Sequence, residues 1–178
     1  MQKLSMDQLN RPDVESFKNQ DKTPVVIVLD NVRSMHNVGS AFRTADGFAA
    51  EKILLCGITG TPPHREIEKT ALGATQSVTW AYYDHSIEAV RALRDEGYTI
   101  FALEQAEGSM PLQRVSFDAS KKYALVFGNE VHGVSDDVMQ VIDGCIEIPQ
   151  FGTKHSLNVS VTVGIVLWQL ICQLKQFS

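Results

Sequence analysis

Short apolar segments rich in β-branched residues alternate with segments of helical periodicity along most of this 178-residue chain. Such apolar runs are typical of strands buried on both faces, and the amphipathic segments between them are typical of crossover helices. The expected strands are 24–30, 52–56, 77–83, 98–104, 123–128 and 145–149, and the expected helices are 37–48, 62–73, 86–97, 135–141 and 159–172. The alternation predicts an α/β fold in which helices flank a mostly parallel sheet.

The chain is expected to form one main domain after a short leader. Its length of 178 residues lies within the range of about 100 to 200 residues that is common for one domain. Its hydrophobic fraction of 44% is sufficient for a sizeable core. The leader is polar and of mixed charge, which predicts no signal peptide and a cytoplasmic location. Two short helical stretches are expected between Ser5 and Asn19. We therefore predict a helical N-terminal extension, residues 1–22, and a domain spanning residues 23–178.

The apolar segment 159–172 is the most hydrophobic part of the chain, yet it does not predict a membrane span. It is shorter than the roughly 20 residues that cross a bilayer, and it contains Thr162, Gly164 and Gln169. A helix that is buried, or that packs in a subunit interface, is expected instead.

Cysteine spacing and net charge exclude several classes of protein. Cys56, Cys145 and Cys172 stand singly in apolar surroundings without a CxxC spacing, so we expect buried thiols rather than a disulfide framework or a metal site. The net charge is −5, whereas nucleic-acid-binding domains are commonly basic. Any binding to RNA would therefore depend on a local basic patch.

Three polar segments follow predicted strands, where ligands of open α/β sheets bind. They are "DNVRSMHNVGSAFRTA", "FGNEVHGVSDD" and "IPQFGTKHSLN". The chain contains no GxGxxG dinucleotide fingerprint, no P-loop and no GxSxG nucleophile elbow. A nucleotide-dependent dehydrogenase, a P-loop enzyme and an α/β-hydrolase are thereby disfavoured.

Together these segments resemble the signature motifs of one family. "NxxSxHNxGSxFRTAD", "FGNExxGxS" and "IPxxGxxxSLNVSV" are similar, in order and spacing, to the motifs of SpoU-type (TrmH-like) RNA ribose 2′-O-methyltransferases of the SPOUT superfamily. The resemblance extends from Val25 to Leu174. Two positions depart from the family pattern: Val131 stands where glycine is frequent, and Gln150 stands where methionine is usual.

The resemblance implies a fold, a cofactor and partners. It implies a deep C-terminal trefoil knot, S-adenosyl-L-methionine as the methyl donor, tRNA or rRNA as the substrate, and a homodimer with active sites near the subunit interface. Two alternatives stay open at this point. One is a catalytically silent RNA-binding or assembly factor on the same scaffold, which the acidic net charge favours. The other is an RNA base methyltransferase.

The resemblance also assigns residues to the site. Those expected to take part in catalysis are Asn37, Arg43, Glu130, Ser156 and Asn158, and those expected to bind the donor are Leu103, Gly128, Asn129, Glu130, Ile148, Pro149, Ser156, Leu157 and Asn158. Read from the residues alone, Asn37 is typical of a helix N-cap, and Ser156 and Asn158 are typical of a helix start. Glu130 is expected to favour a sulfonium or to hold Arg43.

Arg43 is expected opposite the core-facing side of its helix, where it can point at a ligand. A guanidinium has a pKa above about 12, so a role in binding phosphate and stabilising an alkoxide is preferred over a role as base. The alternative is a surface arginine paired with Asp46 or Glu51. Other basic residues that either contact RNA phosphate or are simply solvated are Arg11, Arg33, His64, Arg65, Lys69, Lys154 and His155.

Overall fold

The computed structural model describes residues 1, 3–5 and 7–175. This part of the chain forms a seven-stranded sheet in the order β3-β2-β1-β6-β4-β7-β5. The strands are β1 (Thr23–Asp30), β2 (Ala50–Cys56), β3 (Trp80–Tyr83), β4 (Tyr98–Leu103), β5 (Met110–Pro111), β6 (Lys122–Phe127) and β7 (Gly144–Glu147). Every strand pair within the described residues is parallel, so the predicted α/β class is confirmed.

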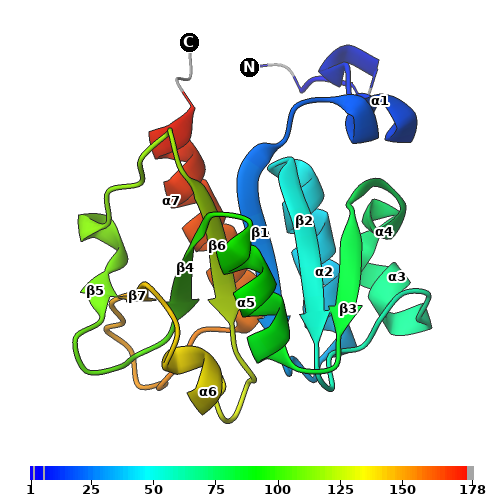
Figure 1. Ribbon diagram of the computed structural model, residues 1–178. Helices are drawn as coiled ribbons and strands as arrows, with labels where there is room; N and C mark the ends of the chain where they lie inside the picture. Colours follow the sequence, from blue (N-terminus) through cyan, green and yellow to red (C-terminus); the bar gives the residue numbers. More distant parts are fainter. Residues whose placement is uncertain (2, 6, 176–178) are drawn as a thin grey trace.

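Helices cover both faces of the sheet (Figure 1). They are η1 (Asp7–Leu9), α1 (Val14–Asn19), α2 (Met35–Gly47), α3 (Arg65–Ala71), α4 (Ala74–Ser77), α5 (Ser86–Asp95), η2 (Leu112–Arg114), α6 (Asp136–Met139) and α7 (Val159–Leu174). Figure 1 shows α5 and α6 in front of the sheet and α2 and α7 behind it. This arrangement is the one that right-handed crossovers between parallel strands produce.

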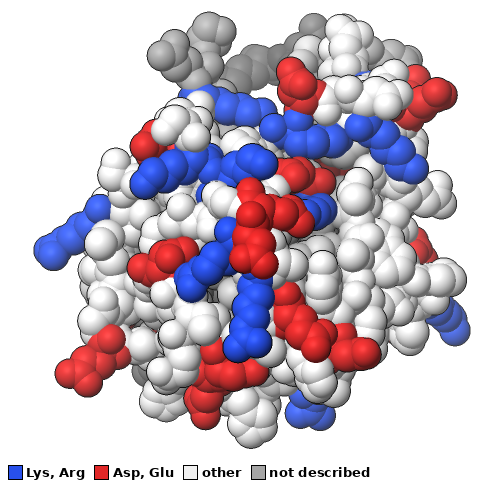
Figure 2. Space-filling model, in the orientation of Figure 1, with Lys and Arg blue, Asp and Glu red and all other residues white. Residues whose placement is uncertain are grey.

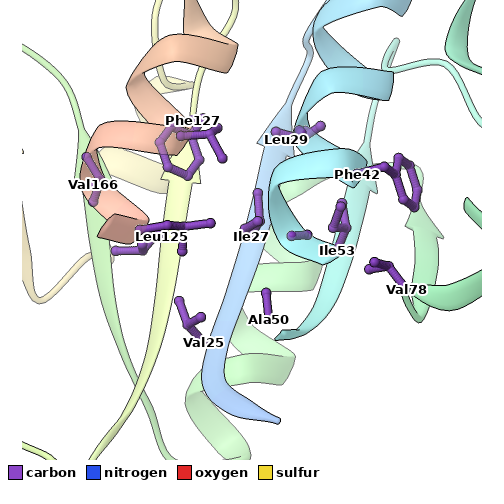
Figure 3. Close-up of a cluster of buried hydrophobic side chains, with 14 of the residues drawn as sticks. Val25, Ile27, Leu29, Phe42, Ala50, Ile53, Val78, Leu125, Phe127 and Val166 are labelled. Atoms are coloured by element: carbon purple, nitrogen blue, oxygen red, sulfur yellow. The ribbon is translucent and has the colours of Figure 1, made fainter. Parts of the chain in front are cut away.

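Central strand β1 is buried on both of these faces. Val25, Ile27 and Leu29 belong to a hydrophobic cluster that includes residues of α2 and α7, whereas Val26 and Val28 belong to a second cluster with residues of α5. Successive side chains of a strand point to opposite faces, which explains the alternation. Figure 3 shows the first cluster, where Phe42 of α2 lies on the same side of the sheet as these strand residues.

The last helix contributes its buried stripe to the same cluster. Val163, Val166, Leu167 and Leu170 are fully buried, and they belong to the same cluster as Leu125 of β6, which Figure 3 shows together with Val166. The spacing of three and four residues is that of one face of an α-helix. The predicted helix 159–172 is thus present, and it continues to Leu174.

Two predicted elements differ from the structure between residues 62 and 83. The expected helix 62–73 begins only at Arg65, after an N-cap at His64, and ends where Leu72 and Gly73 take positive φ values of 51° and 90°. A short additional helix, α4, follows it. The strand expected at 77–83 therefore starts only at Trp80.

Gly39 permits the close contact between α2 and α3. A Cβ atom at this position would lie 2.2 Å from the backbone oxygen of Ile67, well inside the van der Waals distance. Thr70 Oγ1 donates a hydrogen bond to the backbone oxygen of His36 at 3.0 Å in the same contact. The absence of a side chain at Gly39 therefore lets the two helices approach each other closely.

The N-terminal extension contains η1 and α1 on either side of Pro12, as the sequence predicts. Phe17 of α1 is buried and belongs to the main hydrophobic cluster. The division at residue 22 stays a prediction, as does the trefoil knot.

The expectation of three buried thiols is only partly correct. Cys56 is buried, and burial raises its pKa to about 12, with a further contribution from the nearby charge of Asp30. Cys145 is half-buried, whereas Cys172 is exposed on α7. Cys172 follows the buried residue Ile171, but it lies on the side of α7 opposite the buried stripe that faces the sheet.

Charges of both signs are interspersed on the face shown in Figure 2, with Lys and Arg most frequent near the top, where the strands begin. Among the described residues, no helix is both long enough and apolar enough to span a bilayer.

Candidate functional site

The site lies at the carboxyl edge of the sheet, next to the point where the strand order reverses. From β1 the chain continues outward through β2 and β3, whereas β6, β4 and β7 follow on the other side. Ligands of open α/β sheets bind in the crevice that such a reversal creates. The segments after β1, β6 and β7 all emerge at this edge (Figure 1).

A pocket of about 530 Å³ opens there between the ends of three strands and the start of α7. Its apolar surface comes mainly from strand ends, and its polar surface comes mainly from the loops. The lining residues are Leu103, Glu104, Gln105, Phe127, Gly128, Asn129, Glu130, Val131, Gly133, Ile146, Glu147, Ile148, Gln150, His155, Ser156, Leu157, Asn158, Val159 and Thr162.

A chain of side-chain hydrogen bonds joins the three sequence motifs at the wall of this pocket. Asn37 Nδ2 in the first turn of α2 donates to Glu130 Oε1 at 3.0 Å. Asn158 Nδ2 donates to Asn37 Oδ1 at 3.1 Å. Asn158 Oδ1 in turn accepts from the backbone N–H of Ser160 at 2.9 Å and so caps α7.

The groups at the two ends of this series of hydrogen bonds determine which atom of each amide donates and which accepts. A carboxylate only accepts hydrogen bonds, so the amide nitrogen of Asn37 must face Glu130. Its amide oxygen then faces Asn158, which must present its own nitrogen there. The remaining oxygen of Asn158 meets the N–H of Ser160, which only donates. Each amide orientation is therefore determined by its neighbours.

Glu130 also holds the segment that leads from β1 into α2. Its Oε2 accepts from the backbone N–H of Arg33 at 2.9 Å, and its Oε1 accepts from that of Ser34 at 3.0 Å. Partial burial alone would raise the pKa of Glu130, but these hydrogen bonds and the one from Asn37 lower it below the ordinary glutamate value. The structure thus favours an ionised Glu130.

The turn after β6 is itself fixed against β1. Asn129 Nδ2 donates to the backbone oxygen of Asn31 at 2.7 Å, and Asn129 Oδ1 accepts from the backbone N–H of Val131 at 2.9 Å. A Cβ atom on Gly128 would lie 2.1 Å from the backbone carbon of Gly133, so the turn closes only with glycine there. Val131, in place of the family's frequent glycine, is accommodated with its side chain in solvent.

Carboxylates give the pocket a negative character. Glu104 Oε2 accepts from the backbone N–H of Val134 at 3.2 Å, and Glu147 Oε2 accepts from Ser109 Oγ at 2.9 Å. With Glu130, these side chains line the same cavity. Such a pocket favours a ligand that carries positive charge.

The predicted donor-binding residues lie in the pocket lining with one exception, Pro149. Pro149 is half-buried between Ile148 and Gln150, which both reach the pocket. Of the predicted catalytic residues, Glu130, Ser156 and Asn158 line the pocket, and Asn37 contacts it through the hydrogen-bond chain. The expectation that Asn37 caps its helix is wrong, because Ser34 Oγ accepts from the backbone N–H of Asn37 and is the cap.

Arg43 lies apart from this group. It is exposed on α2 and is not among the residues that line the pocket. Within the described part of the chain, no ion pair joins it to Asp46 or Glu51, since Asp46 accepts from Ser77 Oγ and Glu51 accepts from Tyr98 Oη. The pairing expected for a purely structural arginine is therefore not observed.

Glu104, Gln105 and Glu147 are pocket residues that the motifs did not indicate. A signal was present for Glu104 and Gln105, which end and follow the expected strand 98–104 at the edge where ligands bind. Glu147 lies inside the expected strand 145–149 and becomes a strand end only because β7 stops there. The side chain of Gln105 also holds the third motif, donating from Nε2 to the backbone oxygen of His155 at 3.0 Å.

Comparison with known proteins gives one consistent result. Residues 24–168 match the SpoU rRNA Methylase family. The tRNA (guanosine(18)-2'-O)-methyltransferase of Thermus thermophilus is 30% identical over 159 residues, which are 89% of this chain and 80% of that enzyme. The 23S rRNA (guanosine-2'-O-)-methyltransferase RlmB of Vibrio parahaemolyticus is 30% identical over 166 residues, which are 93% of this chain and 66% of that enzyme.

A solved structure, that of the AdoMet bound rRNA methyltransferase from Sinorhizobium meliloti, aligns with a TM-score of 0.80 and 28% identity over 90% of this chain and 61% of that one. This chain thus spans less than two thirds of the Vibrio and Sinorhizobium proteins. The family match extends over most of the 178 residues and includes all three motifs. The chain belongs to the SpoU rRNA methylase family.

Proposed function

We propose that this protein transfers a methyl group from S-adenosyl-L-methionine to the 2′-hydroxyl of a ribose in tRNA or rRNA. The observation that carries the proposal is the hydrogen-bond chain from Glu130 through Asn37 to Asn158, which joins all three motifs at one pocket. Relatives named as 2′-O-methyltransferases of tRNA and of 23S rRNA support this class of reaction.

The pocket fits the donor in size and in chemistry. Its volume of about 530 Å³ lies within the range of about 300 to 1,000 Å³ that is usual for small-molecule sites. Leu103, Ile146 and Ile148 offer an apolar surface to a flat base, and Glu104 and Glu147 complement a positive charge. When bound, S-adenosylmethionine supplies an electrophilic methyl group on a cationic sulfonium. A structural relative described as AdoMet bound supports this assignment.

Arg43 is proposed to act on the RNA. It lies six residues after Asn37 on α2, about 9 Å further along the helix axis, and its side chain is open to solvent. A guanidinium stays protonated, so Arg43 binds a neighbouring phosphate and stabilises the negative charge that develops on the ribose oxygen. The hydroxyl proton leaves to phosphate or water as the ribose oxygen accepts the methyl group. The roles of Ser156 and Asn158 are to shape the donor pocket and to hold Asn37 in place.

The direct test is transfer of a labelled methyl group from S-adenosylmethionine to bulk tRNA and bulk rRNA, followed by mapping of the modified nucleotides. We expect label at a ribose 2′-oxygen in one of the two RNA pools. Label on a base would show an RNA base methyltransferase instead. Donor binding without transfer to either pool would favour the silent RNA-binding factor and would overturn the proposal.

We further propose that the protein is a homodimer that uses the exposed side of α7. Val161, Ile165, Trp168 and Cys172 follow one another at spacings of four, three and four residues, so they form an apolar stripe on one side of the helix. Trp168 is 53% exposed although its ring lies 6.2 Å from that of Phe48. An exposed apolar stripe of this kind is typical of a subunit interface.

The Ile165→Asp variant should be monomeric where the wild-type chain is dimeric, because it places a charge in the centre of the stripe. Light scattering coupled to size-exclusion chromatography measures the mass. Val14→Asp is the matched control, since Val14 is an exposed apolar residue on α1. A monomeric wild-type chain, or equal masses for all three proteins, would exclude a dimer through α7. A cytoplasmic location stays a prediction.

A further inference from the structure

Two loops at the mouth of the proposed donor pocket present large apolar side chains to solvent. Phe151 follows the lining residue Gln150 and is 99% exposed. Val131 lines the pocket from the loop after β6 and is 67% exposed. A phenylalanine ring that lies wholly in water gains favourable apolar burial when a ligand or partner covers it.

The charge around Phe151 indicates what kind of ligand this ring would suit. Segment 148–158 contains no aspartate or glutamate, although the whole chain has 21 acidic residues and a net charge of −5. Lys154 and His155 lie on the same loop and are exposed. An aromatic side chain next to basic groups is the combination with which proteins bind unpaired nucleotides, the ring stacking on a base and the cation contacting phosphate.

We propose that Phe151 is the stacking platform for the base of the target nucleotide. The inference rests on the function proposed above. In a nucleotide the base and the 2′-hydroxyl are attached to neighbouring ribose carbons. A hydroxyl that reacts at the donor pocket therefore places its base within a few ångströms of the pocket mouth, beside Gln150 and Phe151. Stacking selects an unpaired base without reading its identity. Lys154 contacts the adjacent phosphate.

The test compares four proteins: wild type, Phe151→Ala, Phe151→Leu and Phe151→Trp. We measure the KM for the RNA pool that the wild-type chain methylates, the affinity for S-adenosylmethionine alone, and the mass in solution. Stacking on one base contributes about 5- to 150-fold in RNA affinity. The KM for RNA should rise within this range for Phe151→Ala and Phe151→Leu and stay near wild type for Phe151→Trp. Donor affinity and mass should not change.

Any other result would count against Phe151 as a stacking platform. An unchanged KM in Phe151→Ala shows that the ring does not contact the RNA. Full recovery in Phe151→Leu shows that apolar burial, rather than stacking, is what the site needs. A change of mass in Phe151→Ala shows that the ring packs against a second copy of the chain. Absence of methyl transfer by the wild-type chain is a failure of the proposed function, and it is seen before any variant is made.

The Lys154→Ala variant tests the proposed phosphate contact independently of Phe151. Loss of one phosphate contact should weaken RNA binding at low salt and reduce the slope of log affinity against log salt concentration by about 1. Lys121→Ala, at an exposed lysine before β6, is the control and should leave the slope unchanged. Equal slopes for the wild-type and Lys154→Ala proteins would remove Lys154 from the proposed RNA contact.

Discussion

The Arg43→Ala variant is expected to bind S-adenosylmethionine with wild-type affinity and to lose about 100- to 1,000-fold in kcat for RNA methylation. Donor affinity should be retained because Arg43 does not line the pocket. Turnover should be lost because Arg43 is the only lysine or arginine in α2. Calorimetry with the donor and single-turnover methyl transfer measure the two quantities separately.

Two further variants define what Arg43 contributes. Arg43→Lys keeps the charge but loses the planar fork that binds phosphate with two hydrogen bonds, so partial activity is expected. Arg91→Ala removes an exposed arginine of α5, on the opposite face of the sheet, and should retain full activity. Because Arg43 is exposed, Arg43→Ala should change the free energy of unfolding by less than about 0.5 kcal/mol. Full turnover in this variant would exclude the proposed role.

The Asn37→Asp variant should be the most damaging isosteric change in the site. An aspartate at this position can still accept the hydrogen bond from Asn158, but it turns a carboxylate oxygen toward Glu130, to which Asn37 now donates at 3.0 Å. At neutral pH the loss of this bond and the repulsion should lower the free energy of unfolding by about 1 to 2 kcal/mol. Methyl transfer should fall as well, because the first motif loses its link to the second.

The pH dependence of the free energy of unfolding distinguishes repulsion between two carboxylates from the simple loss of the hydrogen bond between Asn37 and Glu130. In the wild-type chain the pKa of Glu130 is lowered, so its contribution to stability is present above the ordinary glutamate pKa and is lost as the pH falls through the lowered value. In Asn37→Asp the two carboxylates raise each other's pKa. One of them then takes up a proton at mildly acidic pH, and the deficit relative to wild type should shrink.

Urea unfolding at several pH values between about 7 and 5 measures this difference. Asn37→Ala is the control, because it removes both hydrogen bonds without adding charge, and its deficit should be nearly constant with pH. A constant deficit for Asn37→Asp would show that the introduced carboxylate and Glu130 do not interact.

The strands and their order along the chain could be predicted because their signal is local. Val25 to Leu29 form an unbroken apolar run, which is sufficient to indicate a strand buried on both faces. The break between α3 and α4 could not be predicted in this way. It depends on Leu72 adopting a positive φ, a conformation that leucine rarely takes and that no local pattern indicates.

For the candidate site as well, part could be predicted from the sequence and part could not. The resemblance placed Glu130, Asn37 and Asn158 in one site, but it could not show that they bond to one another, because 93 and 121 residues separate the bonded pairs. Read from the residues alone, Asn37 is a helix cap, and the structure gives that role to Ser34. Capping preference alone does not distinguish Ser34 from Asn37, because both residue types are good helix caps. The side chain of Asn37 is instead bonded to Glu130, which is distant in the sequence.

Backbone amide chemical shifts during titration with S-adenosylmethionine test most directly whether this pocket holds the donor. We expect saturable binding with the largest shifts at Leu103, Gly128, Ile148 and Leu157, which line the pocket from separate segments. A second, smaller cavity lies on the other side of the turn after β6 and includes Ile58 and Ser135. Shifts confined to Ile58 and Ser135, or no saturable binding, would contradict the account.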